Sequence, residues 1–147
     1  MKIPIILLLS AFVVAGCKTN KPAADGGQTQ SACREMMMLE KPLDSLRFDH
    51  YTIDSIAIRE QCLEIVVSYG GGCGDATFDL YLTNRVMESM PPKTVLYLTF
   101  TDNDACRSIV KKKLKFNLKP YKRFADRGGI YLKIAGTDKS VLYQIPK

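Results

Sequence analysis

The chain has 147 residues, of which 46% are hydrophobic and 24% charged, with one histidine, five cysteines and no tryptophan. This length fits a single domain, and the hydrophobic fraction argues against wholesale disorder. The lone histidine, His50, argues against a multi-histidine metal site or a conventional Ser-His-Asp triad. The formal net charge of +6 indicates anionic surroundings without naming them.

The amino terminus predicts an export signal. Lys2 supplies a positive charge, and residues 3–14 form an apolar stretch broken only by Pro4 and Ser10. This stretch is shorter than the roughly 20 apolar residues that a membrane-spanning helix needs. A short apolar segment that ends in small residues is typical of a secretory signal peptide.

The residues that end this segment carry a more specific signal. The motif Val14-Ala15-Gly16-Cys17 resembles the lipobox of bacterial lipoproteins. The resemblance implies that Cys17 receives a thioether-linked diacylglycerol, that residues 1–16 are removed, and that the new amino group is acylated. Because two or three acyl chains hold a protein durably, we expect a stable membrane anchor. The alternative is a secreted protein with a chance cysteine, which the position and flanks of Cys17 disfavour.

The residues after the lipobox predict a tether and a location. Residues 17–32 are polar and lack apolar periodicity, so we expect the lipidated Cys17 to be followed by a flexible leash. By resemblance to lipoprotein sorting in enterobacteria, a residue other than Asp after the lipidated cysteine, here Lys18, implies the outer membrane. Many surface-displayed lipoproteins carry acidic residues there, so the basic start of this leash indicates a position facing the periplasm. A single β-rich domain is expected over residues 33–147.

Two segments near the strands are ambiguous. Residues 34–39 include three consecutive methionines and predict a helical turn or an edge strand, which Pro42 limits in either case. We interpret these methionines as packing residues rather than as a copper site. Residues 103–111 are compatible with a short helix.

From Tyr51 onward the sequence predicts β structure, because runs rich in Val, Ile and aromatic residues alternate with turn residues. The clearest pattern places Leu114, Phe116 and Leu118 on one face of a strand and lysines on the other. About seven short strands indicate an all-β fold, an antiparallel β-sandwich, with a small β-barrel as the alternative. The expected strands are residues 51–60, 62–69, 77–82, 94–101, 113–119, 130–135 and 141–145.

Four cysteines remain besides Cys17, and disulfides are the default expectation in an exported protein. A straight strand over residues 62–69 spans about 23 Å, and the next four residues return at most about 14 Å, which argues against a Cys62–Cys73 bridge. If successive strands alternate in direction, Cys73 and Cys106 lie at one end of the domain and Cys62 lies at the other, where Cys33 can meet it. We therefore favour Cys73–Cys106 and Cys33–Cys62. No Cys-x-x-Cys motif is present, so a thiol-redox enzyme is not indicated.

Three short motifs contain residue types that can bind ligands or take part in catalysis. The glycine-rich residues 70–75 could present backbone N–H groups to an anion, but they lack phosphate-loop and dinucleotide spacing and are interpreted as a permissive loop. Residues 102–104 lack the Gly and Glu of a calcium loop and are interpreted as a turn. The pair Asp49-His50 is interpreted as a surface feature. We expect no catalytic residue, metal site or cofactor.

Basic side chains concentrate in one segment, with nine of them against one acid over residues 107–127. Such a row could bind an anionic lipid or glycan near the membrane. Exposed lysines on an edge strand also prevent sheets from pairing with their neighbours, and this is the favoured interpretation. Nucleic acid is a poor partner candidate in a cell envelope. The candidate ligand-binding residues are Lys111, Lys113, Lys115, Lys119 and Arg123.

The globular part is similar to small lipoproteins that are common in Bacteroidota. That group has no defining catalytic motif, so the resemblance implies an envelope location and a β fold but no activity. The residues that carry it are Cys62-Leu63-Glu64-Ile65, Ser68-Tyr69-Gly70-Gly71-Gly72-Cys73, Phe78-x-Leu80, Pro91-Pro92, Asp104-x-Cys106 and Leu118-Lys119-Pro120.

These observations lead to one main functional hypothesis and three alternatives. The main hypothesis is a non-enzymatic outer-membrane lipoprotein with a binding or structural role in the envelope. The first alternative binds anionic lipid or glycan through the basic row. An inhibitor of a lysozyme-like enzyme is disfavoured, because such targets are usually basic and would repel this chain. An envelope hydrolase of unknown type is the last alternative.

Overall fold

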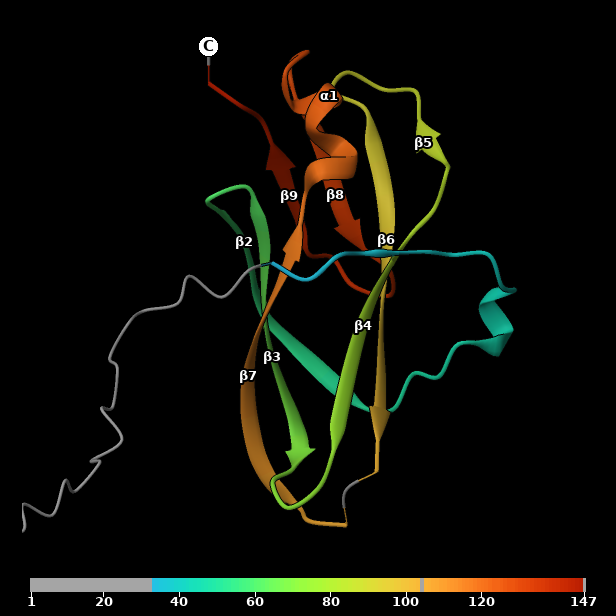
Figure 1. Cartoon of the computed structure of the whole chain (residues 1–147), viewed down its shortest axis with the longest axis vertical. Coiled ribbons are helices and arrows are strands. Elements are labelled where there is room, and N and C mark those ends of the chain that lie inside the picture. Colours follow the sequence, from blue (N-terminus) through green and yellow to red (C-terminus); the bar gives the residue numbers. More distant parts are fainter. Residues whose placement is uncertain (1–32, 104, 147) are drawn as a thin grey trace, which may run out of the picture.

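The structure is a computed structural model that describes residues 33–103 and 105–146. The predicted signal peptide, Cys17 and the tether lie outside the described residues. Alternation of apolar and polar side chains folds the rest into two sheets that face each other, as Figure 1 shows. The predicted all-β sandwich is confirmed, since the strands form two separate sheets rather than one closed sheet. Most strand pairs are antiparallel as predicted, but two pairs in the larger sheet are parallel.

The smaller sheet has three antiparallel strands in the order β2-β3-β7. The first two are joined by a two-residue turn, Glu60 and Gln61, whose φ angles of 49° and 67° are those of the tight hairpin turns that match strand twist. The third strand runs beside β3 over its whole length. The strands are β2 (Tyr51–Arg59), β3 (Cys62–Gly71) and β7 (Ser108–Asn117).

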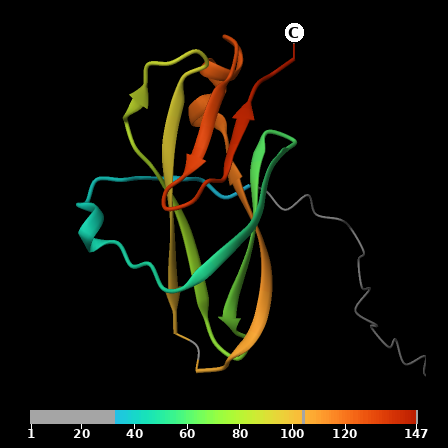
Figure 2. The same cartoon turned by 180° about the vertical axis from the view of Figure 1, so that it is seen from behind.

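The larger sheet has six strands and is organised around β6. The second half of β6 pairs with β4, and its first half pairs with β5 and, in parallel, with β8. At the far edge, β9 comes close to β2 and closes one side of the sandwich, as Figure 2 shows from behind. The strands are β1 (Met37–Met38), β4 (Ala76–Leu82), β5 (Val86–Met87), β6 (Lys93–Asp102), β8 (Ile130–Ile134) and β9 (Ser140–Tyr143).

The core lies between the two inner faces, where alternate residues of each strand are buried. At its centre, Phe78 and Phe100 stack with their ring centroids 4.3 Å apart, and Tyr51 contacts both rings edge-on. The predicted inward face of residues 113–119 is confirmed, since Leu114, Phe116 and Leu118 are all buried. The largest fully buried side chains are Phe78, Phe100, Phe116, Leu63, Ile65, Leu80, Leu96, Leu98, Leu118, Ile130, Leu132 and Ile134.

The domain has two disulfides, one at each end of the sandwich. The loops from β3 to β4 and from β6 to β7 both cross between the sheets at the lower end in Figure 1. Cys73 and Cys106 connect these loops, with their Cα atoms 5.8 Å apart. Cys33 and Cys62 form the other bridge, at a Cα separation of 6.0 Å. These are the two pairings that the strand directions favour, and the extended β3 keeps Cys62 away from Cys73.

The prediction of a short helix within residues 103–111 is wrong. Pairing with β3 extends β7 back to Ser108, so ladder hydrogen bonds decide the conformation of this lysine-rich stretch. The helical residues come later, where Pro120 follows the strand and fits the start of a helical turn. They are the 3-10 helix η2 (Lys119–Tyr121) and the α-helix α1 (Lys122–Ala125). Of the two structures predicted for residues 34–39, a helical turn or an edge strand, the edge strand is confirmed, because β1 pairs with β4 at the edge of the larger sheet.

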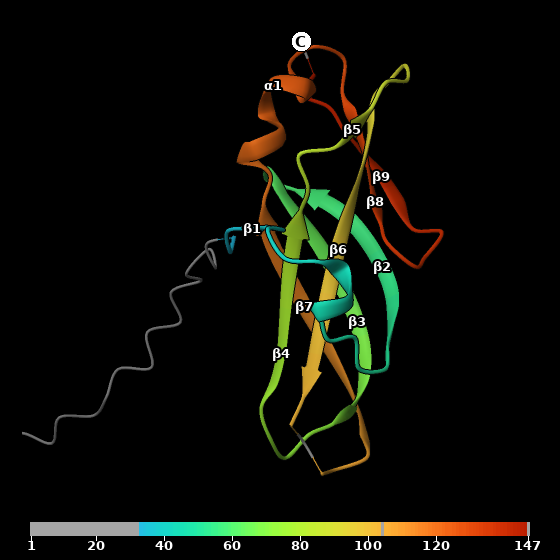
Figure 3. The same ribbon diagram turned by 90° about the vertical axis from the view of Figure 1, so that its right-hand side faces the viewer.

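A strap, defined as residues 39–48, crosses the outer face of the larger sheet, as Figure 3 shows. At one end the backbone N–H of Leu39 donates to the carbonyl of Leu82 on β4, with an N···O distance of 2.9 Å. Just beyond its other end, the N–H of Asp49 donates to the carbonyl of Phe100 on β6 at 3.0 Å. These two hydrogen bonds fix the strap to β4 at one end and to β6 at the other. Between them the strap contains the 3-10 helix η1 (Leu43–Ser45).

Candidate binding groove

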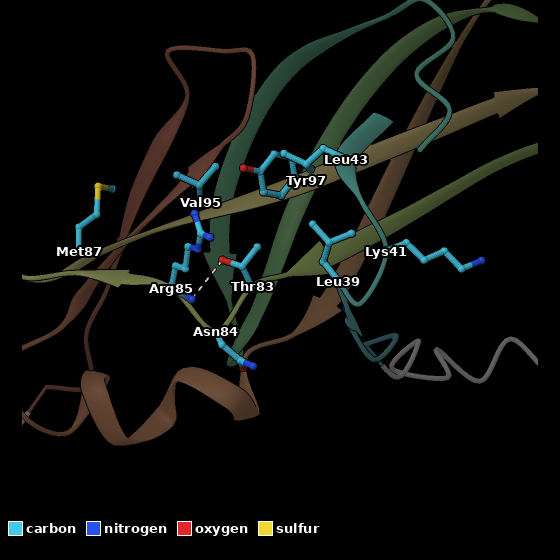
Figure 4. A pocket seen from close by; sticks show the side chains of 9 residues that line it. All are labelled: Leu39, Lys41, Leu43, Thr83, Asn84, Arg85, Met87, Val95 and Tyr97. Atoms are coloured by element: carbon cyan, nitrogen blue, oxygen red, sulfur yellow. Dashed lines mark hydrogen bonds between the residues drawn. The ribbon is translucent and has the colours of Figure 1, made fainter. Parts of the chain in front are cut away.

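The strap and the outer face of β6 enclose two hollows that meet at Leu43 and Tyr97. Each has a volume of about 470 Å³. The first, shown in Figure 4, lies toward β4 and β5, and the second lies toward the turn between β8 and β9. We call the two together the groove. The first hollow is lined by Leu39, Lys41, Leu43, Thr83, Asn84, Arg85, Met87, Val95 and Tyr97, and the second by Leu43, Phe48, Tyr51, Ile53, Tyr97, Ala135, Gly136 and Thr137.

The floor of the groove follows from the alternation of β6. Leu96 and Leu98 point into the core and are buried, so the side chains between and before them, Tyr97 and Val95, must face outward. The strap passes over this outward face because backbone hydrogen bonds hold its two ends to opposite edges of the β4–β6 pair. The first hollow therefore lies over the outer face of the sheet, whereas the second also reaches Ile53, a core residue, and Tyr51, which packs against the core.

The rim toward β5 is built by a break in the edge of the sheet. Residues 83–85 leave the ladder between β4 and β5, which both pair with β6. The buried hydroxyl of Thr94 donates to the carbonyl oxygen of Arg85 at 3.0 Å, and the Arg85 N–H donates to the Thr83 hydroxyl at 3.4 Å. These contacts fix the backbone of Arg85, while its side chain extends over β6 toward Val95, as Figure 4 shows.

The groove exposes apolar side chains to solvent. Leu43 is 43% exposed, and Phe48 and Met87 are each 50% exposed. All three line the groove, although large apolar side chains are usually buried. Clusters of exposed apolar residues in a concave surface are characteristic of ligand or partner sites.

The charges along the groove are one-sided. Of the described residues, only Lys41 and Arg85 are charged and line either hollow, and both belong to the first. Within residues 33–103 and 105–146, neither forms an ion pair with a carboxylate. The groove is therefore cationic at its β4–β5 end and uncharged at its β8–β9 end. A further hollow of about 600 Å³ adjoins the groove at Met87 and contains Glu88.

The basic residues singled out from the sequence lie elsewhere. Lys111, Lys113 and Lys115 share the outer face of β7, as their alternation predicts. The Lys111 Nζ is 3.5 Å from the Asp54 carboxylate, and the Lys113 Nζ is 3.4 Å from that of Glu64. These acids belong to β2 and β3, and it is the pairing of the strands that places them beside the lysines of β7.

The other two candidate ligand-binding residues lie beyond the end of the strand. Lys119 begins η2, and Arg123 in α1 places its guanidinium 4.9 Å from the ring centroid of Phe124. The structure thus brings three of the five candidate residues onto one strand face and leaves two on the helical segment that follows.

In the Asp49-His50 pair, Asp49 has a structural role and His50 is exposed. The Asp49 carboxylate accepts a hydrogen bond from the backbone N–H of Asp102 at 2.8 Å and lies 3.1 Å from the guanidinium of Arg47. The Asp102 N–H lowers the pKa of the Asp49 carboxyl, against a smaller opposing effect of desolvation, and Arg47 lowers it further. Across the part of the chain that the structure describes, no cluster of three or more His, Cys, Asp or Glu residues could hold a metal ion.

Sequence reasoning missed the groove. Its floor could have been inferred, because Val95 and Tyr97 alternate with core residues on a strand that was predicted. Its roof could not, because nothing local to Leu43 or Phe48 indicates that the strap crosses a strand some fifty residues later in the chain. Arg85 carried no motif that would distinguish it from any other surface arginine.

Comparisons with known proteins bear on the fold alone. No protein-family model and no curated protein matches the sequence. Among solved structures, a DUF1344 protein of unknown function from Bacteroides vulgatus is similar, with a TM-score of 0.55 and 15% sequence identity. The match covers 78% of this chain and 57% of that protein, so this chain spans little more than half of its length.

The disulfides bear on the location. Disulfides form and persist in oxidising compartments and are rare in the cytosol. The two bridges of this domain therefore indicate an extracytoplasmic location. Among the described residues, no helix is long and apolar enough to cross a membrane.

Proposed function

We propose that this chain is a non-enzymatic outer-membrane lipoprotein, held by lipid on Cys17 and facing the periplasm, whose domain binds a ligand in the groove. The observation that carries the binding role is the set of exposed apolar side chains, Leu43, Phe48 and Met87, gathered in one concave surface. Because exposing such side chains without a partner is unfavourable, their gathering supports a surface that is covered in use.

The anchor and the envelope location are supported by independent features. The Val14-Ala15-Gly16-Cys17 motif resembles a lipobox, and the two disulfides require an oxidising compartment to form. Lys18 supports sorting to the outer membrane, and the basic residues near it support a periplasmic orientation.

Fractionation of cells tests the anchor. Cys17→Ser should abolish acylation, measured by incorporation of an alkyne-labelled fatty acid, and should release the protein from membranes. Lys18→Asp should keep acylation but move the protein to the inner membrane, while the matched Lys18→Ala should stay in the outer membrane. Membrane retention of the Cys17→Ser protein would overturn the lipoprotein assignment.

Photo-crosslinking in cells tests the binding role. A benzoylphenylalanine at position 97, which lies at the junction of the two hollows, should form a defined adduct upon irradiation. The control is the same substitution at Arg59, an exposed residue at the end of β2 that lines neither hollow. Equal adducts at both positions, or none at position 97, would contradict ligand binding in the groove.

An alternative role, binding of anionic lipid or glycan through the outer face of β7, is supported by the alignment of Lys111, Lys113 and Lys115 on that face. In the ion pairs with Asp54 and Glu64 the lysine side chains are 72% and 58% exposed, although the two acids are more buried. Pairs between exposed charges are worth about 0–1 kcal/mol, so an anionic polymer could compete with the acids for these lysines. Replacing the three lysines with Gln should weaken salt-sensitive binding to such polymers. Unchanged binding would rule this alternative out.

A further inference from the structure

We infer that the groove binds a single-chain anionic amphiphile of the fatty-acid class, with its carboxylate at Arg85 and its acyl chain crossing β6 beside Tyr97 toward Phe48. The inference rests on the proposed binding role and adds to it the chemical class of the ligand and its direction in the groove. It follows from the charge, the hydrogen bonding and the shape of the two hollows.

The first hollow is suited to the anionic head. Arg85 presents a planar guanidinium, which can bind both oxygens of a carboxylate. Its backbone is held by Thr94 and Thr83, so the side chain projects from a fixed base. Figure 4 shows the Tyr97 hydroxyl turned toward the Arg85 end of the hollow rather than toward Lys41. Among the residues that the structure describes, no acidic side chain lines this hollow, and Glu88 lies in the hollow that adjoins it at Met87.

The second hollow is suited to the apolar tail. The Tyr51 hydroxyl already donates to the carbonyl of Leu98 at 2.7 Å. The Thr137 hydroxyl donates to the carbonyl of Ile134 at 3.1 Å and accepts from the N–H of Lys139 at 3.1 Å. The hydroxyls of Tyr51 and Thr137 therefore have partners within the protein, and the Tyr97 hydroxyl is turned toward Arg85. What this hollow offers a ligand is mostly aromatic and aliphatic surface, including Phe48 and Ile53.

The shape favours one chain over a bilayer or a sugar. The groove runs from β5 across β6 to the turn after β8, which is about 10 Å for two strand spacings. Its lining is concave and partly roofed by Leu43 on the strap, so a planar membrane surface cannot follow it. A glycan would need polar partners along its whole length, and the second hollow offers few.

The test uses the lipidated protein in nanodiscs of neutral phosphatidylcholine. The probe is a twelve-carbon fatty acid with a diazirine in the chain, and its methyl ester is the uncharged match. Peptide mapping should find the acid attached to the strap or to residues 85–97, with at least about tenfold less labelling by the ester, since a charge-assisted carboxylate contact is lost. Excess dodecanoate should compete.

Two arginine variants make the head-group assignment falsifiable. Arg85→Gln should reduce labelling by about tenfold, because the guanidinium contact is lost. Arg59→Gln, a matched change outside the groove, should leave labelling unchanged. Both side chains are exposed, so neither change threatens folding. Labelling that is equal in both variants, or equal for acid and ester, overturns the inference.

The remaining outcomes separate this inference from the binding role on which it rests. Protection of the strap from hydrogen exchange in phosphatidylglycerol nanodiscs without free fatty acid would assign the groove to a membrane surface and overturn the inference. An adduct at position 97 in cells, without labelling by the fatty-acid probe, overturns the ligand class but leaves the binding role standing. Failure of both experiments overturns both.

Discussion

The carboxylate of Asp49 accepts a hydrogen bond from the backbone N–H of Asp102, with 2.8 Å between Oδ2 and the nitrogen. This contact joins Asp49, the residue that follows the strap, to the last residue of β6, next to the backbone hydrogen bond from Asp49 to Phe100. Two adjacent bonds from one residue fix where the strap leaves the larger sheet and β2 begins. The position of the groove's roof therefore depends in part on an ionised side chain.

Asp49→Asn should make the stability of the domain less dependent on acid pH. The pKa of the Asp49 carboxyl lies below its ordinary value of 3.8, chiefly because the Asp102 N–H donates to its charged form. Its contribution to stability is therefore present above that value and is lost as the pH falls through the lower pKa of the folded state. Urea midpoints should differ between wild type and Asp49→Asn at pH 7 and converge below pH 3.8. The strap variant Asp44→Asn serves as the control, and a difference that stays constant with pH would contradict this role.

Gly129→Ala should destabilise the domain more than Gly128→Ala. Both glycines have positive φ angles, 103° and 117°, so alanine is strained at either position, by about 1–3 kcal/mol. Only at Gly129 does an added Cβ meet close neighbours, 2.9 Å from Leu142 Cδ1 and 3.1 Å from the carbonyl oxygen of Tyr143. Overpacking of this kind adds about 1–3 kcal/mol. Equal free energies of unfolding for the two variants would show that the turn relaxes around the new methyl group.

Replacing Cys73 and Cys106 together by Ser should lower the free energy of unfolding by about 3–4 kcal/mol, since the bridge closes a loop with a sequence separation of 33. The bridge between Cys33 and Cys62 has a separation of 29, so the loop-entropy account predicts nearly the same loss for that pair. Guanidinium unfolding of the two double variants measures both. Losses that differ by more than about 1 kcal/mol would mean that native-state interactions, rather than loop closure, dominate one of them.

Arg34→Gln should weaken the side of the sandwich where β4 and β7 face each other. The Arg34 guanidinium donates to the carbonyl of Phe78 on β4 at 2.8 Å and lies 4.8 Å from the ring centroid of Phe116 on β7. Losing a charge-assisted hydrogen bond and a cation–π contact should cost about 1–2 kcal/mol. Thermal or urea unfolding measures this cost, and Arg59→Gln, whose side chain is exposed at the end of β2, should cost close to nothing. Arg34→Gln with the stability of Arg59→Gln would show that the contact contributes nothing.

The sequence predicted the strands well where alternation and turn residues agree. Leu114, Phe116 and Leu118 are buried because their strict alternation leaves one apolar face. The beginning of the same strand was missed, because Ile109 faces solvent and Lys112 takes an inward position, reaching the carbonyl of Ala76. Pairing with β3, rather than local pattern, makes these residues a strand.

The candidate site was hidden for a related reason. The basic row is visible in the sequence because its members are neighbours in the chain, but the acids that pair with it come from other strands. The groove depends on three separate segments, represented by Leu43, Arg85 and Tyr97, which only the tertiary fold brings together. Local periodicity contains no information about which distant segments of the chain come into contact.

The Cys33–Cys62 disulfide also has a mechanical consequence. Tension applied to the chain ahead of Cys33 has a covalent path directly to the first residue of β3, while residues 34–61 lie in the loop that the bridge closes. β3 is the central strand of the smaller sheet and is hydrogen-bonded to β2 and β7. Tension therefore reaches a strand that two ladders hold in place, without passing through the strap that roofs the groove.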